Sequence, residues 1–352
     1  MTIHHKKRIL VAPLNWGLGH ATRCIPIINE LIQNNFEPII ASDGASLELL
    51  KKEFPNLEAV ELPSYNIRYS KNPNRLRLKF LKNAPRLLKI IKKEEKVIRE
   101  LVNSKSISGI ISDNRFGVRH DNIPSVFITH QLQVLSGNTT WLSTKWHQKI
   151  ISQFDECWIP DYKTEKNLSG ILGHVENFKS TVNYLGPLSR FEKHKSNINY
   201  QLLVILSGPE PQRTFLEEIL FEALKNFKGK ICFVKGVIES EQRKIQHNHM
   251  TIYNFMTSAQ LESTINESEL IVSRSGYTTL MDLAKLEKKA FFIPTPGQFE
   301  QDYLAKKIES EGIAPYCTQH EFTLEKLNHV EKYSGFKFET FDVKFADLFR
   351  LF

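Results

Sequence analysis

Short apolar runs rich in β-branched residues alternate with longer helix-like segments along almost the whole chain. The first apolar run covers residues 8–13, a helix-like segment covers 21–33, and a second apolar run covers 37–42. Parallel strands need a crossover connection, usually a helix, so this alternation predicts doubly wound parallel sheets with helices on both faces. The 352 residues suffice for about two such domains. We therefore predict an α/β protein with two Rossmann-like domains.

The expected strands and turns also indicate where the domains divide. Further strands are predicted at 58–62, 107–112, 125–129, 156–160, 182–185, 201–206, 230–235, 251–253, 270–272 and 290–293. Gly186-Pro187 and the polar run that follows are typical of a linker. We predict an N-terminal domain over 1–186, a linker over 187–200, a second domain over 201–324 and a tail over 325–352.

The composition is that of a globular protein, with 41% hydrophobic and 24% charged residues. No window approaches the roughly 18 uninterrupted apolar residues of a membrane-spanning helix, and residues 1–8 lack the apolar core of a signal peptide. The 4 cysteines are far apart and show neither metal-ligand spacing nor a disulfide framework. We therefore expect a cytoplasmic protein without a metal site.

The positive net charge is concentrated in residues 65–99. This segment holds 12 basic residues and two acidic ones, and its cations alternate with Leu, Ile and Phe around an interruption at Pro85. Two interpretations stay open. The segment docks on an anionic membrane surface, at the inner face of the cell membrane, or its lysines cover a solvated helix face. Nucleic acid is not an expected partner, because no aromatic stacking platform accompanies the cations.

The second half contains a strand–turn–helix pattern suited to an anion. An apolar strand at 270–272 ends in the small polar turn 273–276, and a helix is predicted over 277–286. The backbone N–H groups and the positive end of such a helix attract a phosphate. Asp282, about one and a half turns into the helix, can then accept hydrogen bonds from hydroxyl groups beside that phosphate.

A second loop is expected at the same sheet edge, because the carboxyl ends of parallel strands meet there. It leaves the strand at 290–293 and carries Gln298, Glu300 and Gln301. Anion, hydroxyl and amide chemistry together predict a nucleotide-sugar site. Its candidate residues are Arg274, Ser275, Gly276, Thr278, Asp282, Gln298, Glu300 and Gln301. For Arg274 two roles stay open, namely pairing with a donor phosphate and locking the loop.

The first strand leads into Gly17-Leu18-Gly19-His20, at the start of a helix. His20 can take a proton from an acceptor hydroxyl that attacks an anomeric carbon, and the positive helix end favours its neutral form. The alternative is that the two glycines and His20 only shape the turn. The dinucleotide fingerprint is excluded, because no third glycine follows at its spacing.

Other polar residues are predicted at the same edge of the first sheet. Asp113 follows a buried strand and is expected to orient His20, to act as the base itself or to cap a helix. His130 follows the next strand and is expected on the acceptor side, together with Asn15 and Arg115.

Two motifs resemble the peptidoglycan N-acetylglucosaminyltransferases of the MurG type, in glycosyltransferase family 28. They are Arg274-Ser275-Gly276 with Asp282 six residues after Gly276, and Pro294…Glu300-Gln301…Leu304-Ala305. This sequence departs from the family pattern at Asp282 (usually Glu), Glu300 (Gln) and Leu304 (Asn). The resemblance implies the GT-B fold, in which two Rossmann-like domains face each other across a cleft and the tail returns to the first domain.

The resemblance also implies a function and further site residues. In that family Gly19 faces the donor phosphates, Ser207 and Gly208 stand where the phosphate loop lies, and the backbone of Phe255 and Met256 reads the uracil edge. We expect inverting, metal-independent transfer of a sugar from a UDP-sugar to a hydroxyl acceptor, which in this family is often lipid-linked. No cofactor is expected beyond the UDP-sugar co-substrate.

Gly19-His20-x-x-Arg23-Cys24 is also similar to the UDP-sugar hydrolase of pseudaminic acid synthesis. In that enzyme water is the acceptor. A UDP-sugar hydrolase or epimerase of the same fold is therefore the first alternative, and a non-catalytic sugar-nucleotide-binding protein is the second.

Overall fold

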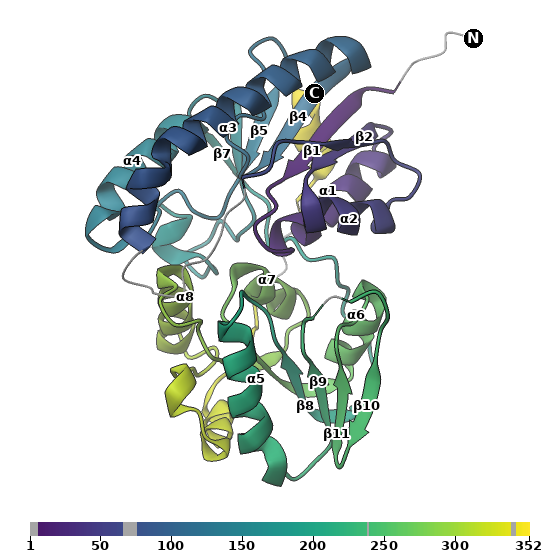
Figure 1. The fold of residues 1–352 in the computed structure, drawn as a ribbon, viewed down its shortest axis with the longest axis vertical. Helices are drawn as coiled ribbons and strands as arrows, with labels where there is room; N and C mark the ends of the chain where they lie inside the picture. The colour runs from purple at the N-terminus through teal and green to yellow at the C-terminus, as the bar shows by residue number, and fades with distance from the viewer. Residues whose placement is uncertain (1–5, 66–75, 238, 339–342) are drawn as a thin grey trace. The chain divides into compact units, whose positions relative to one another are not determined.

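The computed structural model describes residues 6–65, 76–237, 239–338 and 343–352, without the side chains of 76–84 (Figure 1). The described residues form two compact units. The first unit comprises 6–65, 76–190 and 343–352, and the second comprises 191–237 and 239–338.

The first unit is built on a seven-stranded parallel sheet with the order β3-β2-β1-β4-β5-β6-β7. Its strands are β1 (Arg8–Pro13), β2 (Glu37–Ser42), β3 (Ala59–Glu61), β4 (Ile107–Asp113), β5 (Ser125–Ile128), β6 (Glu156–Ile159) and β7 (Thr181–Tyr184). Ile9, Leu10 and Val11 are completely buried, because helices cover both faces of the sheet as the alternating pattern predicted.

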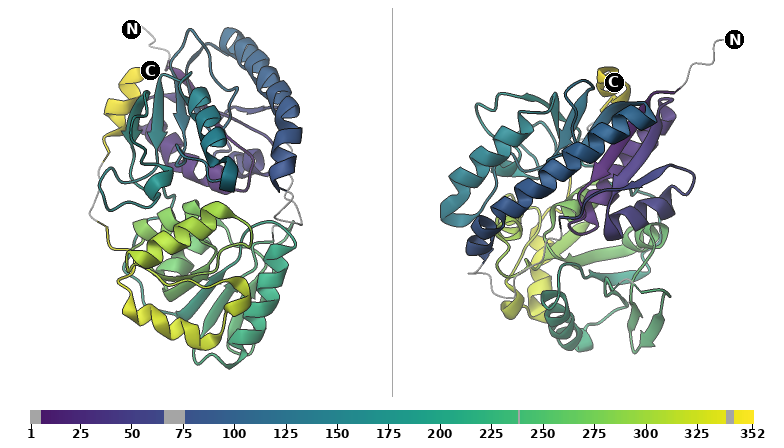
Figure 2. Two further views of the ribbon diagram at one scale, coloured as in Figure 1. Left: turned by 90° about the vertical axis from the view of Figure 1, so that its left-hand side faces the viewer. Right: turned by 45° about the horizontal axis from the view of Figure 1, so that its top comes forward.

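The helices α1 (Gly19–Gln33), α2 (Gly44–Glu53), α3 (Leu76–Lys105) and α4 (Thr140–Ile151) pack against this sheet. Ile98 and Leu101 of α3 pack on Leu10 and Ile110 of the sheet. Figure 2 shows the long α3 running across the sheet. The sequence did not predict α4. Its apolar residues Trp141 and Leu142 are exposed, so the apolar positions of this segment do not mark a single buried helix face.

The second unit is built on a six-stranded sheet with the order β10-β11-β9-β8-β12-β13. Its strands are β8 (Tyr200–Ile205), β9 (Ile231–Val234), β10 (Lys244–His247), β11 (Met250–Tyr253), β12 (Ser268–Ser273) and β13 (Lys289–Phe292). Its helices are α5 (Gln212–Ala223), α6 (Ser258–Asn266), α7 (Tyr277–Lys285) and α8 (Phe299–Ser310). The edge strand β10 pairs antiparallel with β11, whereas all the other pairs are parallel.

The tail is shorter than predicted. The helical segment η6 (Leu324–Lys332) belongs to the second unit, because Leu327 and Val330 pack into that unit's core. Only the end of the chain, with α9 (Phe345–Leu348), belongs to the first unit. There the carbonyl group of Phe352 accepts a hydrogen bond from Lys7 Nζ at 2.7 Å.

Among the described residues, no helix is long and apolar enough to cross a membrane.

Candidate active site

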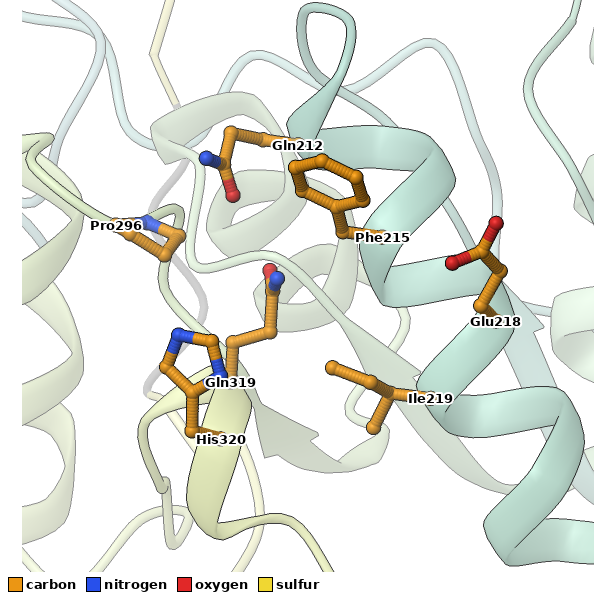
Figure 3. A pocket seen from close by; sticks show the side chains of 7 residues that line it. All are labelled: Gln212, Phe215, Glu218, Ile219, Pro296, Gln319 and His320. Atoms are coloured by element: carbon orange, nitrogen blue, oxygen red, sulfur yellow. The ribbon is translucent and has the colours of Figure 1, made fainter. Parts of the chain in front are cut away.

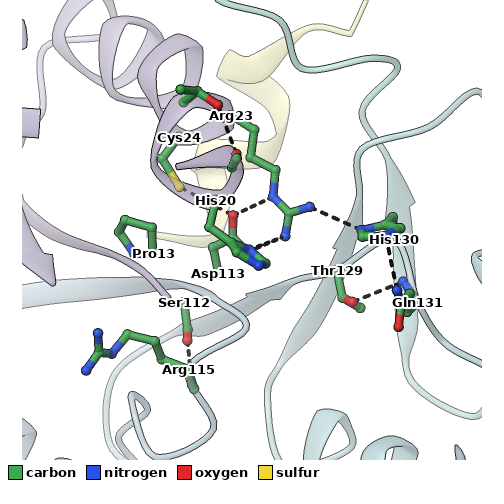
Figure 4. Close-up of polar contacts among 12 residues, drawn as sticks. Pro13, His20, Arg23, Cys24, Ser112, Asp113, Arg115, Thr129, His130 and Gln131 are labelled. Carbon is green, nitrogen blue, oxygen red and sulfur yellow. Dashed lines mark hydrogen bonds and ion pairs between the residues drawn. The ribbon is translucent and has the colours of Figure 1, made fainter. Parts of the chain in front are cut away.

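Three ionisable side chains meet at the carboxyl edge of the first unit's sheet (Figure 4). His20 is the second residue of α1, Arg23 lies almost one turn further along the same helix, and Asp113 ends β4. His20 Nδ1 is 2.8 Å from Asp113 Oδ1, and Arg23 Nε donates to Asp113 Oδ2 at 2.5 Å. Arg23 is 2% exposed and Asp113 is completely buried, so their ion pair is shielded from water.

Two contacts of Nδ1 bear on the tautomer of His20. An Nδ1–H that donates to Asp113 Oδ1 at 2.8 Å leaves Nε2 as the acceptor of the ring, whereas Arg23 Nη2, 2.9 Å from the same nitrogen, can only donate and favours a bare Nδ1. Burial lowers the pKa of His20 below its usual value, and the charge of Asp113 opposes this shift without overcoming it. The imidazole is therefore neutral at neutral pH. In the tautomer whose Nδ1–H donates to Asp113, Nε2 makes no hydrogen bond to a described residue and can accept a proton.

Asp113 is suited to orienting His20 rather than to taking a proton. Burial alone would raise the pKa of Asp113, but the charges and hydrogen bonds of Arg23 and His20 outweigh it and hold that pKa at about 2. Both carboxylate oxygens accept hydrogen bonds from Arg23. A carboxylate this acidic is a weak base at neutral pH, so the structure supports the orienting role.

His130 joins the same cluster from the neighbouring strand, because it lies just after β5. Its Nδ1 is 3.2 Å from Arg23 Nη1, and its side chain is buried. Sequence reasoning did not single out Arg23 as a site residue. Its position in the sequence could have indicated this role, because Arg23 is three residues after His20 and residues three apart on a helix lie on the same face.

Arg115 is not available to bind the substrate that accepts the sugar, which corrects the prediction from the sequence. It is completely buried, with Nε 2.8 Å from Glu94 Oε1 and Nη1 2.8 Å from Asp43 Oδ1, and its Nη2 donates to the Pro63 carbonyl at 2.6 Å. Its guanidinium points away from His20 in Figure 4. The two buried carboxylates hold this cation inside the unit, so it forms part of the scaffold.

Asn15 is likewise engaged within the protein. Its Nδ2 donates to Asp43 Oδ2 at 3.2 Å, and its Oδ1 accepts from the Ser46 backbone and hydroxyl group at 3.4 and 3.3 Å. Gly44 has a φ of +51°, which favours glycine, and a Cβ added there would lie 2.4 Å from Asn15 Nδ2 and displace that side chain. Asn15 therefore ties the loop before His20 to the start of α2.

The predicted donor residues lie at the carboxyl edge of the second unit's sheet, where β8, β12 and β13 are neighbours. Gly276 caps the N-terminus of α7, Thr278 is in its first turn, and Asp282 is half-buried further along the same helix. Ser207 and Gly208 follow β8, and a Cβ built on Gly208 would lie 3.7 Å from Thr295 Oγ1 in the loop after β13. The structure therefore brings the three loops together.

Gln301 braces the loop after β13. Its Oε1 accepts from the Thr295 N–H at 2.8 Å, and its Nε2 donates to Gln298 Oε1 at 2.8 Å. Its backbone carbonyl accepts from Ser275 Oγ at 2.8 Å, which ties this loop to the turn before α7. Glu300 is half-buried in the first turn of α8. Ser275 is completely buried, so its side chain supports the loops and does not reach a ligand.

Arg274 locks the loops, and the structure thereby decides between the two roles that the sequence left open. Nη1 donates to the carbonyl groups of Ile293 and Pro294 at 3.0 Å. Nη2 donates to the Gln212 carbonyl and to Gln319 Oε1 at 2.8 Å. Arg274 is 1% exposed and none of these acceptors is a carboxylate, and burial lowers its pKa to about 10. A guanidinium with its terminal N–H groups used in this way does not grip a phosphate.

The backbone of Phe255 already forms hydrogen bonds within the protein, which corrects the prediction that it is available to the uracil ring of the donor. Its N–H donates to Asn254 Oδ1 at 3.0 Å, and its carbonyl group accepts from Gln242 Nε2 at 2.7 Å. Met256 is half-buried beside it. Within the described parts of the chain, no cluster of three His, Cys, Asp or Glu side chains could hold a metal ion.

The chain is similar to known proteins both within the second unit and over nearly its whole length. Residues 202–332 match the model of the glycosyltransferase family 28 C-terminal domain. Over 136 residues the chain is 36% identical to a UDP-N-acetylglucosamine–N-acetylmuramyl-(pentapeptide) pyrophosphoryl-undecaprenol N-acetylglucosamine transferase of Methylobacterium radiotolerans, a match that covers 36% of this chain and 37% of that protein. An uncharacterised glycosyltransferase of Methanosarcina mazei is 23% identical over 92% of this chain and 89% of its own length.

Solved structures share the fold over nearly the whole chain. MurG of Acinetobacter baumannii is 16% identical with a TM-score of 0.54, and the match covers 94% of this chain and 93% of MurG. The spinosyn rhamnosyltransferase SpnG, solved in complex with thymidine diphosphate, is 13% identical with a TM-score of 0.62, again over 94% and 93%. The predicted fold, two Rossmann-like domains of the GT-B type, is thereby confirmed.

Proposed function

We propose that this chain, a GT-B-fold glycosyltransferase whose second unit is a family 28 C-terminal domain, moves a sugar from a UDP-sugar to the hydroxyl group of an acceptor. The second unit binds the nucleotide sugar at the loops after β8, β12 and β13. The first unit supplies the base. The reaction inverts the anomeric centre, because the acceptor oxygen displaces the diphosphate in a single step.

The observation that carries this proposal is the arrangement of His20. Its Nδ1 is fixed by the buried Asp113 at 2.8 Å, its pKa is lowered by burial, and Nε2 is left to take the proton of the attacking hydroxyl. The leaving diphosphate is stabilised by the N-terminus of α7, where Gly276 is the cap. In this proposal neither a metal ion nor a further cofactor takes part.

Asp282 is proposed to bind the ribose hydroxyls of UDP, because it lies on α7 beyond the phosphate-binding turn. Asp282→Ala should weaken UDP binding by about 1–3 kcal/mol, the usual cost of losing a charge-assisted hydrogen bond. Calorimetric titration with UDP measures this. Glu269→Ala, at the opposite end of β12, removes an exposed carboxylate and serves as the control. Equal UDP affinity of wild type and Asp282→Ala would remove Asp282 from the site.

Hydrolysis is the second candidate, because the motif shared with the hydrolase converges on Asp113. Arg23 pairs with Asp113, and the Cys24 thiol lies 3.6 Å from its Oδ2. The two reactions differ in their product when a UDP-sugar is incubated alone. A hydrolase releases UDP and free sugar at its full rate, whereas a transferase accumulates both only slowly until a hydroxyl acceptor is added.

The donor is identified first, by thermal shift with UDP-, GDP- and dTDP-sugars. A ligand present at 100 times its Kd stabilises the folded protein by about 2.7 kcal/mol, so the correct donor should raise the melting temperature clearly.

The acceptor is proposed to be lipid-linked and to be reached from an anionic membrane surface. Residues 66–75 of the basic segment lie outside the described residues, and α3 contains most of the remainder. The side chains of Arg86 and Lys89 on α3 are exposed, beside the exposed Leu88. Trp146 of α4 packs edge-on against Phe116, and Phe116 belongs to the same apolar cluster as Leu87 and Ile90 of α3, so the two helices are near each other.

Helix α4 adds apolar side chains to this face. Trp141 is 69% exposed, Leu142 is 47% exposed, and Lys145 and Lys149 lie on the same helix. Exposed tryptophan and leucine beside lysines are typical of helices that rest in the interfacial region of a bilayer. The membrane surface therefore contacts α4 together with α3.

Two double variants separate the contribution of charge to vesicle binding from that of the apolar side chains. Trp141→Ser with Leu142→Ser should lower binding to anionic vesicles at least about tenfold, because two exposed side chains no longer enter the interface. Lys89→Gln with Lys92→Gln should weaken binding by about 1 kcal/mol for each cation at low salt. Ile32→Ser, on α1 at 41% exposure, is the control. Sedimentation with vesicles decides the matter, and wild-type protein that stays in the supernatant at low salt would refute membrane docking.

A further inference from the structure

A hollow on the second unit is formed by segments far apart in the sequence (Figure 3). Its volume is about 410 Å³, which is within the range of about 300–1,000 Å³ found for small-molecule sites. One face of α5 forms one wall, η5 (Gln319–Glu321) forms the opposite wall, and Pro296 of the loop after β13 closes one side.

Arg274 fixes the orientation of one polar group in this hollow. Its Nη2 donates at 2.8 Å both to Gln319 Oε1 and to the carbonyl group of Gln212. Because the amide oxygen of Gln319 accepts from Arg274, its NH2 group is turned away from that guanidinium. Figure 3 shows the amide end of Gln319 pointing toward Gln212 and Phe215. Gln319 is 2% exposed, so the hollow contains a prearranged N–H donor on a buried side chain.

The remaining polar groups are available to a ligand. The side chains of Gln212, Glu218 and His320 line the hollow, and they form no hydrogen bond with any residue that the structure describes. No lysine or arginine is among the lining residues, and Glu218 adds a carboxylate. This charge pattern disfavours phosphates and other anions and favours a neutral ligand that both donates and accepts hydrogen bonds.

The apolar groups give the ligand its shape. Phe215 is 46% exposed at the mouth of the hollow, and Ile219 and Pro296 provide further apolar surface. A ligand that matches both sets of groups has an apolar face and a rim of hydroxyl or amide groups. A pyranose ring has this arrangement, since its C–H groups form flat faces and its hydroxyl groups lie around the edge.

We propose that this hollow is a carbohydrate-binding site that takes a neutral sugar ring, with Phe215 against a C–H face and the Gln319 amide donating to a hydroxyl group. The hollow shares the loop after β13 with the proposed nucleotide site, but its lining includes neither Asp282 nor any residue of the turn before α7, where the anion is proposed to bind. The proposal goes beyond the proposed transferase function, because it would hold for a protein that binds glycans without transferring sugar.

Saturation-transfer NMR on the full chain tests the site directly. The probes are methyl glycosides of glucose, galactose, mannose, N-acetylglucosamine and N-acetylgalactosamine, each measured with and without saturating UDP. We expect transfer to at least one probe, and we expect it to persist in UDP. Phe215→Ala should raise the Kd of that probe about 3- to 10-fold, the usual effect of losing an aromatic contact. His320→Ala, at a second wall, should also raise it.

Ile198→Ala is the matched control, because Ile198 is 48% exposed in the same unit but does not line the hollow. It should leave the Kd unchanged. The proposal is wrong if no probe shows transfer to the wild type, if UDP abolishes the transfer, or if Phe215→Ala and His320→Ala bind the probe as the wild type does. Because UDP affinity is measured separately, failure here is distinguishable from failure of the proposed nucleotide site.

Discussion

His20→Ala should lower kcat by about 10²–10⁴-fold while the affinity for the donor stays near that of the wild type. The reason is that His20 lies on the first unit, whereas the proposed nucleotide site is built from β8, β12 and β13 of the second. Single-turnover kinetics with the identified donor measure the rate, and titration with UDP measures the affinity. An equal loss of rate and affinity would mean that His20 only shapes its loop.

The pH dependence gives an independent readout of the same assignment. Burial lowers the pKa of His20, so the neutral base persists below the usual histidine value of about 6.5. Plotted against pH, kcat/KM should therefore be flat near neutrality and should fall only as acid protonates His20 below that value. Asp113, with a pKa of about 2, does not titrate in this range. If kcat/KM already fell with decreasing pH at pH 6.5 or above, the assignment of His20 as a buried base would be contradicted.

Gln131→Ala is a suitable control for these experiments. Gln131 Nε2 lies 3.3 Å from His130 Nε2, at the rim of the same cluster, but it has no contact with His20 or Asp113 among the hydrogen bonds described above. Its loss should change kcat by less than tenfold. A loss comparable to that of His20→Ala would indicate that the whole rim, and not the base, determines the rate.

Local patterns in the sequence were sufficient for most of the framework. The run at 8–13 and the run at 37–42 predicted β1 and β2 with the observed ends, because strands buried on both faces are continuous apolar runs. Since parallel strands end at one edge, the positions of Asp113 and His130 just after predicted strands also indicated their proximity to His20. The strand β10 was missed, because all four of its residues are exposed at the sheet edge.

The roles of the arginines could not be deduced in this way. Arg115 and Arg274 both stand next to predicted site residues, and from the sequence either could reach a ligand. Their partners are distant in the chain, with Glu94 21 residues from Arg115 and Gln319 45 residues from Arg274. Only the packing of α3 and η5 brings these acceptors to the guanidinium groups, and this packing leaves no local signal.

The buried network around Arg115 leads to the second large effect, which concerns stability. Arg115→Met should destabilise the first unit by about 3–5 kcal/mol, because it leaves the buried carboxylates of Glu94 and Asp43 without their cation. For a unit of this size, such a loss lowers Tm by roughly 6–20 °C. Differential scanning calorimetry should show this shift in the transition of the first unit only.

The pH and a second substitution identify the cause of that loss. Burial already raises the pKa of Glu94 despite Arg115, and removal of the cation raises it further. A buried Glu94 that binds a proton more readily in the folded state destabilises the variant more as pH rises, so the Tm deficit should shrink as pH falls. Glu94→Gln in the Arg115→Met background should recover part of the Tm, whereas the same change in the wild type should lower it. An Arg115→Met variant that kept its Tm and lost affinity for the acceptor would instead restore Arg115 to the acceptor site.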